Sequence, residues 1–159
     1  MGFASCCRAL AALAAGALAL PAQTSAPHVV SATPPPDLAA RAGADVQVPL
    51  RITIRAGYHI NSDKPADEYL IPTALTWSPG SLALKGVAYP KAESVKYEFS
   101  EQPLLVFSGT VTLNSRFSVA AGAPKGPLSL AGKVRYQACN DKMCLPPRTL
   151  DVSVPLRIE

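Results

Sequence analysis

Apolar and polar residues alternate along most of the chain beyond residue 28. The alternation is clearest at 46–54, 128–137 and 149–158, where apolar side chains recur at every second position. Successive side chains of a β-strand point to opposite faces of the sheet, so these stretches predict strands with one buried face. Shorter stretches predict further strands at 28–32, 58–61, 70–77, 82–90 and 104–113, the last kinked at Gly109.

Turn-forming residues separate these stretches at intervals of about 8–12 residues. The chain has 16 prolines, and helical patterns are scarce in it. Proline cannot donate to a ladder, so 34–36 ends the first strand and Pro49 predicts an edge or a bulge. We therefore expect an all-β domain with about seven to nine strands, a number typical of an immunoglobulin-like β-sandwich.

The first 22 residues have a different pattern, which predicts a signal peptide at 1–22 and a mature domain at 23–159. Arg8 precedes an apolar run at 9–20, and small residues at 17–22 offer cleavage sites. The run of about 12 residues is too short to span a bilayer. We expect an exported protein without stable membrane insertion after cleavage, and an N-terminal membrane anchor is the alternative.

Charge and cysteine content narrow the possible functions. The net charge is +4, and the charged residues are scattered without a Lys/Arg cluster, so we expect no nucleic-acid partner. Signal cleavage would remove Cys6 and Cys7 and leave Cys139 and Cys144 as the only pair. Two cysteines in an exported protein usually form one disulfide.

Cys139 and Cys144 lie between two predicted strands with four residues between them. A hairpin there would bring their Cα atoms within disulfide distance. Closing a loop of about six residues stabilises a fold by only about 2 kcal/mol, so the pair would add little stability as a structural disulfide. A local pair also leaves a sulfur accessible for thiol–disulfide exchange. A redox-active dithiol and a structural disulfide both remain open.

A third interpretation is a Cu(I) site, in which Met143 and the two cysteines act with the distant His28 or His59. No Cys-x-x-Cys motif or histidine cluster completes such a site. We therefore expect neither a metal nor a cofactor.

The residues around the pair carry a family resemblance. Tyr-Gln-Ala-Cys at 136–139 and Cys-Leu-Pro-Pro at 144–147 resemble the signature of the N-terminal periplasmic domain of the thiol:disulfide interchange protein DsbD. Gly-Tyr-His-Ile-Asn at 57–61, Asn-Ser-Asp-Lys-Pro at 61–65 and Leu-Ile-Pro-Thr at 70–73 look like standalone members of that domain family. The resemblance covers roughly 28–158 and implies an immunoglobulin-like sandwich, in agreement with the strand pattern.

The resemblance also implies an activity, that of a protein-disulfide reductase. A membrane-associated reductase would reduce the pair, which would then pass electrons to oxidised thioredoxin-like proteins. By analogy with the family, Cys144 would form the mixed disulfide and Cys139 would resolve it.

Five further residues enter the predicted site through the resemblance. The family covers its cysteines with a cap loop, which matches Tyr97, Glu98 and Phe99 here. Phe99 would shield the sulfurs, unless it is an ordinary loop aromatic packed on the core. Glu98 would raise the thiol pKa, and Asp67 and Glu68 are the alternative residues for this role. Tyr136 belongs to the motif, and His59 would assist proton transfer or serve a structural role.

The sequence departs from the family pattern in three respects. The spacer has four residues where the classical domain has five, and His59 and Asn61 replace aromatic residues that line the classical site. The membrane-spanning and C-terminal thioredoxin-like domains are absent, so we expect a chain that needs partner proteins to relay electrons across a membrane.

The alternative function is a non-enzymatic immunoglobulin-like binding module with a structural disulfide, or a Cu(I)-binding chaperone.

Overall fold

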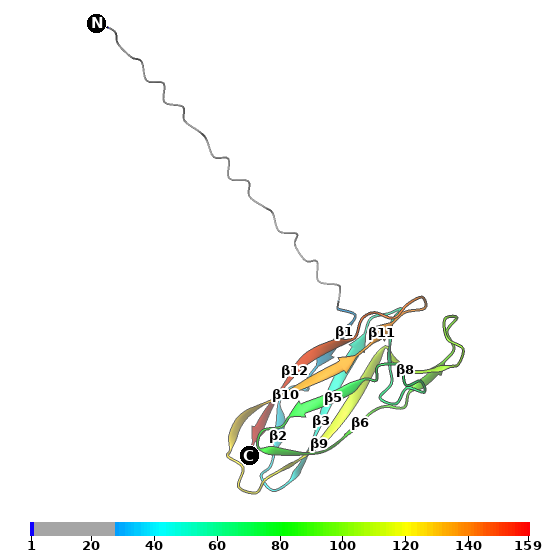
Figure 1. Ribbon diagram of the computed structural model, residues 1–159. Helices are drawn as coiled ribbons and strands as arrows, with labels where there is room; N and C mark the ends of the chain where they lie inside the picture. Colours follow the sequence, from blue (N-terminus) through cyan, green and yellow to red (C-terminus); the bar gives the residue numbers. More distant parts are fainter. Residues whose placement is uncertain (2–27) are drawn as a thin grey trace.

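The computed structural model describes Met1 and residues 28–159, so the expected signal peptide, apart from Met1, lies outside the described residues. The described residues form strands and no helix (Figure 1). The strands are β1 (Val30–Thr33), β2 (Leu38–Ala40), β3 (Asp45–Ile54), β4 (His59–Asn61), β5 (Ala74–Ser78), β6 (Leu82–Ala88), β7 (Glu93–Val95), β8 (Leu104–Ser108), β9 (Thr110–Val119), β10 (Gly126–Tyr136), β11 (Ala138–Cys139) and β12 (Arg148–Ile158). The expected all-β class is confirmed.

The described part of the chain has twelve strands rather than the expected seven to nine. Four of them, β2, β4, β7 and β11, have only two or three residues. Segments this short show little alternation, and of the four only β4, whose three residues are all buried, overlaps a predicted strand, the one at 58–61. Such strands are defined by their pairing with distant partners, which a local pattern does not report.

The strands form three sheets with the orders β1-β3-β9-β6, β2-β12-β10-β5 and β11-β4-β8-β7. Side chains of the first two sheets share the hydrophobic core, as Leu50 and Leu113 of one sheet cluster with Val134 and Val152 of the other. These two sheets are the layers of the sandwich. The third sheet lies at one end of it, opposite to the end that holds the C-terminus (Figure 1).

The strands with the clearest alternation are also the longest in the structure. In β3, β10 and β12 buried and exposed residues alternate as the sequence predicts. Pro49 is paired on one side only, with Asn114 of β9, because the pairing of β1 with β3 ends at Arg51. The expected local edge at Pro49 is therefore confirmed.

Two predicted strands differ from the observed ones. The stretch 104–113 is divided at Gly109, whose φ of 60° turns the chain from β8 in the third sheet into β9 in the first. Residues 70–73 are not a strand, and β5 begins only at Ala74. Thr73 instead donates hydrogen bonds to the carbonyl oxygens of Asn61 and Ser62, which ties the preceding loop to the end of β4.

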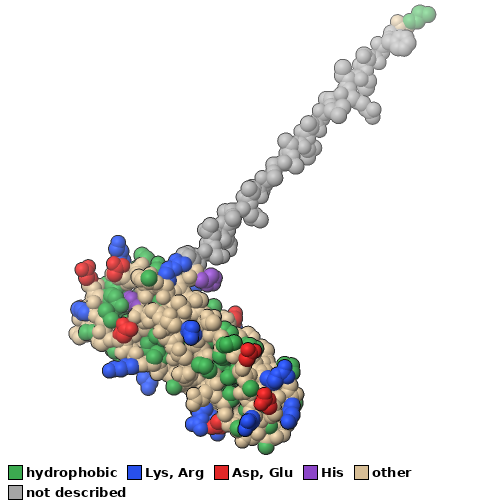
Figure 2. Space-filling view, turned by 180° about the vertical axis from the view of Figure 1, so that it is seen from behind, with side chains coloured by type: hydrophobic (Ala, Val, Ile, Leu, Met, Phe, Trp, Pro, Cys, Tyr) green, Lys and Arg blue, Asp and Glu red, His purple; other side chains and the backbone are tan. Residues whose placement is uncertain are grey.

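Trp77 packs against both core clusters and joins the two layers. Its indole Nε1 donates to Ser115 Oγ at 2.7 Å, and its ring meets Phe117 edge-on with centroids 5.8 Å apart. On the outside, basic and acidic side chains are interspersed over the face shown in Figure 2. Within residues 28–159 no helix is long and apolar enough to cross a membrane.

Candidate functional site

Cys139 and Cys144 form a disulfide at the edge of the third sheet that β11 provides, with an S–S distance of 2.02 Å. The flanking backbone makes a hairpin, in which Leu145 N donates to Ala138 O at 2.8 Å and Asn140 N donates to Met143 O at 2.9 Å. The cysteines therefore occupy a non-hydrogen-bonded cross-strand position, where paired Cα atoms approach most closely. The two Cα atoms lie 3.9 Å apart.

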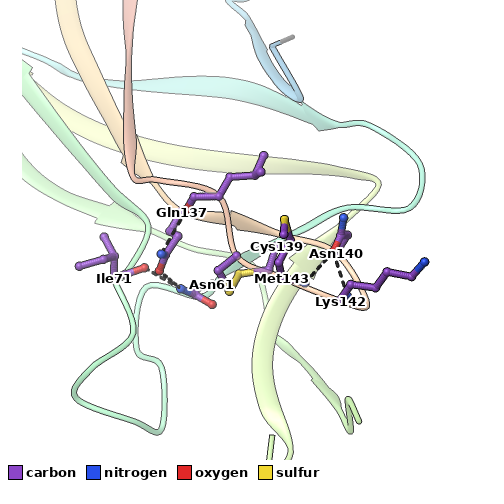
Figure 3. The surroundings of a disulfide bond; sticks show 9 residues. Asn61, Ile71, Gln137, Cys139, Asn140, Lys142 and Met143 are labelled. Carbon is purple, nitrogen blue, oxygen red and sulfur yellow. Dashed lines mark hydrogen bonds between the residues drawn. A yellow bond between two sulfur atoms is a disulfide. The ribbon is translucent and has the colours of Figure 1, made fainter. Parts of the chain in front are cut away.

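The side chain of Asn140 organises the tip of this hairpin. Its Oδ1 accepts hydrogen bonds from Lys142 N at 2.9 Å and from Met143 N at 2.8 Å (Figure 3). An asparagine that bonds its own backbone two residues on forms an Asx-turn. The turn closes the four-residue spacer and keeps the two cysteines opposite one another.

The two cysteines differ in their access to solvent. Cys139 is completely buried, with 0% of its surface exposed, whereas Cys144 is exposed. Met143, beside Cys144, is exposed too. A partner that approaches the hairpin therefore meets Cys144 first.

A network of amide side chains holds the base of the hairpin. Gln137 Nε2 donates to Leu145 O at 3.3 Å, and its Oε1 accepts from Asn61 Nδ2 at 3.4 Å. Asn61 Nδ2 also donates to Ile71 O at 2.9 Å (Figure 3). Both arms of the hairpin and the loop before β5 are thus joined to the end of β4. The motifs at 57–61 and 136–139 contain these two residues, but their positioning role is not evident from the sequence.

His59 lies beside Cys139 because β11 and β4 pair with Cys139 opposite His59. The imidazole is 3% exposed, and its Nε2 has no hydrogen-bond partner. Burial lowers the pKa of His59 below its ordinary value, because desolvation disfavours the charged imidazolium. The structure thus places His59 opposite Cys139, and a part for His59 in proton transfer stays a prediction.

The loop that contains Tyr97, Glu98 and Phe99 covers His59, and Tyr97 is the residue that contacts the imidazole. Tyr97 stacks on the imidazole with ring centroids 4.3 Å apart, and Phe99 stacks on the outer side of Tyr97 at 5.4 Å. Burial, and then the charge of Glu93, raise the pKa of Tyr97. Glu98 is exposed, and the ammonium group of Lys96 donates to backbone carbonyls at 100 and 101, which closes the loop.

Phe99 is 43% exposed and lines a surface pocket of about 600 Å³ together with 66–70 and 100–104. Neither cysteine is among the residues that line this pocket. A shielding role for Phe99 and a thiol-tuning role for Glu98 stay predictions.

Tyr136 is buried at the end of β10, where it pairs with Arg148 of β12. It lines a cavity of about 190 Å³ whose wall includes Tyr58, Ala138 and Leu145. Burial raises the pKa of Tyr136, and the charge of Arg148 opposes this effect. Tyr136 thus packs beneath the hairpin.

No three His, Cys, Asp or Glu side chains gather into a metal-binding group in residues 28–159.

Comparison with known proteins gives one family match. The family model of the thiol:disulfide interchange protein DsbD, N-terminal, matches residues 28–155. Comparison with curated protein sequences gives no significant match.

Among solved structures, the N-terminal periplasmic domain of ScsB from Proteus mirabilis is similar, with a TM-score of 0.51 at 15% identity. The likeness covers 80% of this chain and 44% of that one, so this chain spans less than half of the solved relative, and it shows a shared fold. The fimbrial subunit AggA from Escherichia coli aligns over 82% of this chain and 94% of its own with a TM-score of 0.38 at 10% identity.

Proposed function

The chain belongs to the family of the N-terminal domain of the thiol:disulfide interchange protein DsbD, and we propose that it is an exported domain that reduces disulfides through Cys139 and Cys144. The proposed compartment is the periplasm, reached through the signal peptide at 1–22. The proposed clients are oxidised thioredoxin-like proteins, and a membrane-associated reductase returns the pair to the dithiol.

The unequal exposure of the two cysteines is the observation that carries this proposal. Exchange begins when a thiolate attacks a partner's disulfide, so the attacking sulfur has to be accessible. Cys144 is exposed and Cys139 is fully buried. We therefore assign the attack on the partner to Cys144 and the resolution of the mixed disulfide to Cys139.

The reaction has two steps. The Cys144 thiolate attacks one sulfur of the partner's disulfide, forms a mixed disulfide and releases the other partner sulfur as a thiolate. The Cys139 thiol then loses its proton, attacks Cys144 Sγ and expels the second partner thiolate. The partner gains two electrons, and the protein is left with the disulfide seen in the structure.

Trapping the intermediate tests this proposal. Reduced Cys139→Ser protein is mixed with an oxidised, purified thioredoxin, and adducts are separated on a non-reducing gel. We expect a mixed disulfide through Cys144, because the resolving thiol is missing. The matched Cys144→Ser protein should give none, since its remaining thiol is buried.

The reduction potential of the wild-type pair gives a second test. Equilibration in glutathione buffers should give a value within the range of exchanging dithiols. A potential below about −300 mV is typical of inert structural disulfides, and would contradict the proposal. The absence of any Cys144 adduct would contradict it as well.

A further inference from the structure

The fully buried Cys139 has to lose a proton before it can attack, and it has no access to water. The thiolate, not the thiol, is the nucleophile in thiol–disulfide exchange. A thiol at the surface can release its proton to solvent. A thiol that is sealed from solvent needs a proton acceptor inside the protein.

His59 is the neighbour that is placed for this task. Residues that are directly opposite in an antiparallel pair carry their side chains on the same face, with Cβ atoms about 4.5–5.5 Å apart. Cys139 is opposite His59 in the pairing of β11 with β4. The imidazole and the buried sulfur therefore lie on the same face of the third sheet.

The other neighbours of His59 leave its Nε2 without a partner. Ser108 is opposite His59 on β8, but its Oγ donates to the carboxylate of Glu93 at 3.0 Å. Tyr97 covers the ring by stacking. Nε2 is buried and makes no hydrogen bond in the disulfide form. The sulfur of a disulfide has no proton to donate, whereas the thiol of Cys139 has one.

We propose that His59 is the proton acceptor for Cys139 in the resolving step, an inference that rests on the proposed function of the pair. In the mixed disulfide, the proton of Cys139 moves to Nε2 of His59. The Cys139 thiolate then attacks Cys144 Sγ, the bond between Cys144 and the partner sulfur breaks, and that sulfur leaves as a thiolate. The imidazolium returns its proton to the leaving thiolate or to solvent.

A small-molecule disulfide reagent allows the rates of the two steps to be measured separately, without a protein partner. Reduced protein is mixed with equimolar 5,5′-dithiobis(2-nitrobenzoate), and the release of coloured thiolate is followed. The first equivalent reports the attack by Cys144, and the second reports the resolution by Cys139. We expect His59→Phe, which keeps an aromatic ring against Tyr97, to slow the second phase about tenfold or more at about pH 6.5. The first phase should be unchanged.

The pH dependence provides a signature that a packing role does not share. The titratable groups around His59 are Cys139 on β11, the phenol of Tyr97 and, beyond Ser108, the carboxylate of Glu93. A rising pH lowers the free energy that ionisation of the Cys139 thiol requires, with or without His59, so the advantage of an internal proton acceptor decreases. The gap between wild type and His59→Phe should therefore narrow as the pH rises from about 6.5 to about 9.

Two variants control the experiment. His28→Phe removes the exposed second histidine and should leave both phases unchanged. His59→Gln keeps hydrogen-bonding atoms but takes no proton near neutral pH, so it should be as slow as His59→Phe. A second phase at the wild-type rate in His59→Gln, or an equal slowing of both phases, overturns the role of His59. These outcomes are distinct from a failure of the proposed function, which is a missing Cys144 adduct with thioredoxin.

Discussion

Gln137 Nε2 donates a hydrogen bond to the carbonyl oxygen of Leu145 at 3.3 Å, and this contact joins the two arms of the hairpin just below the disulfide. The amide oxygen of the same side chain accepts from Asn61 on β4. The Gln137 side chain thus joins the two arms of the hairpin to each other and to β4, the strand that carries His59.

Replacement of Gln137 by leucine should lower the free energy of unfolding by about 1–2 kcal/mol, since two partly buried hydrogen bonds are lost at similar side-chain volume. Urea denaturation of the oxidised protein measures the change. Gln47→Leu on β3 is the matched control, because Gln47 is exposed and should change stability by less than about 0.5 kcal/mol. Equal effects of the two substitutions would contradict the positioning role of Gln137.

Replacement of Asn140 by alanine should make the disulfide easier to reduce. The variant loses the Asx-turn that holds the spacer closed, at a cost of about 1 kcal/mol. The equilibrium constant with glutathione should therefore shift about fivefold toward the dithiol. Asn140→Asp keeps an acceptor oxygen at the same place and should stay near the wild-type value. A shift of equal size in Asn140→Asp would show that the turn hydrogen bonds are not responsible.

The buried imidazole of His59 should make stability depend on pH. Its pKa is lowered in the folded protein by desolvation, so the unfolded chain binds a proton more readily. The contribution of the neutral His59 to the free energy of unfolding is therefore fully present above about pH 6.5. It is lost as the pH falls from there through the pKa of His59 in the folded protein. Urea unfolding at about pH 7.5 and 5.5 should show a larger loss for wild type than for His59→Phe. Both proteins contain His28, so a difference between them reflects His59. Equal losses would contradict the burial of an ionisable His59.

The contact of Gly132 with Trp77 should not tolerate a larger residue. A Cβ at Gly132 would lie 2.5 Å from Trp77 Cε3, and the hydrogen bond from the indole to Ser115 limits movement of the ring. Gly132→Ala should destabilise the domain by about 1–3 kcal/mol in urea denaturation. Gly86→Ala on β6 is the control, because a Cβ there meets no atom within 4 Å. A Gly132→Ala protein as stable as this control would show that the ring moves freely.

The stacking order of the cap loop predicts which aromatic residue protects the site. Tyr97 lies directly on His59, and Phe99 lies outside Tyr97. Tyr97→Ala should therefore increase the rate at which dithiothreitol reduces the disulfide more than Phe99→Ala does. The reverse order would favour Phe99 as the shielding residue.

The local sequence pattern was enough to predict the long strands and the position of the cysteine pair. In β3, β10 and β12 one face is buried along most of the strand, so apolar residues recur at every second position and the period is readable. The short spacer between two such strands also predicted a hairpin disulfide, and the structure contains it. The Asx-turn at Asn140 was not predicted, although asparagine favours such turns.

The sequence by itself determined the β class, the long alternating strands and the pair of cysteines, because each depends on residues that are close together along the chain. Only the tertiary structure decided that Cys139 is buried and Cys144 exposed, that His59 is opposite Cys139, and that Tyr97 covers it. The two relations of His59 join segments that are 38 and 80 residues apart. The register between such segments is set by packing across the sheet, which a periodicity within one segment does not record.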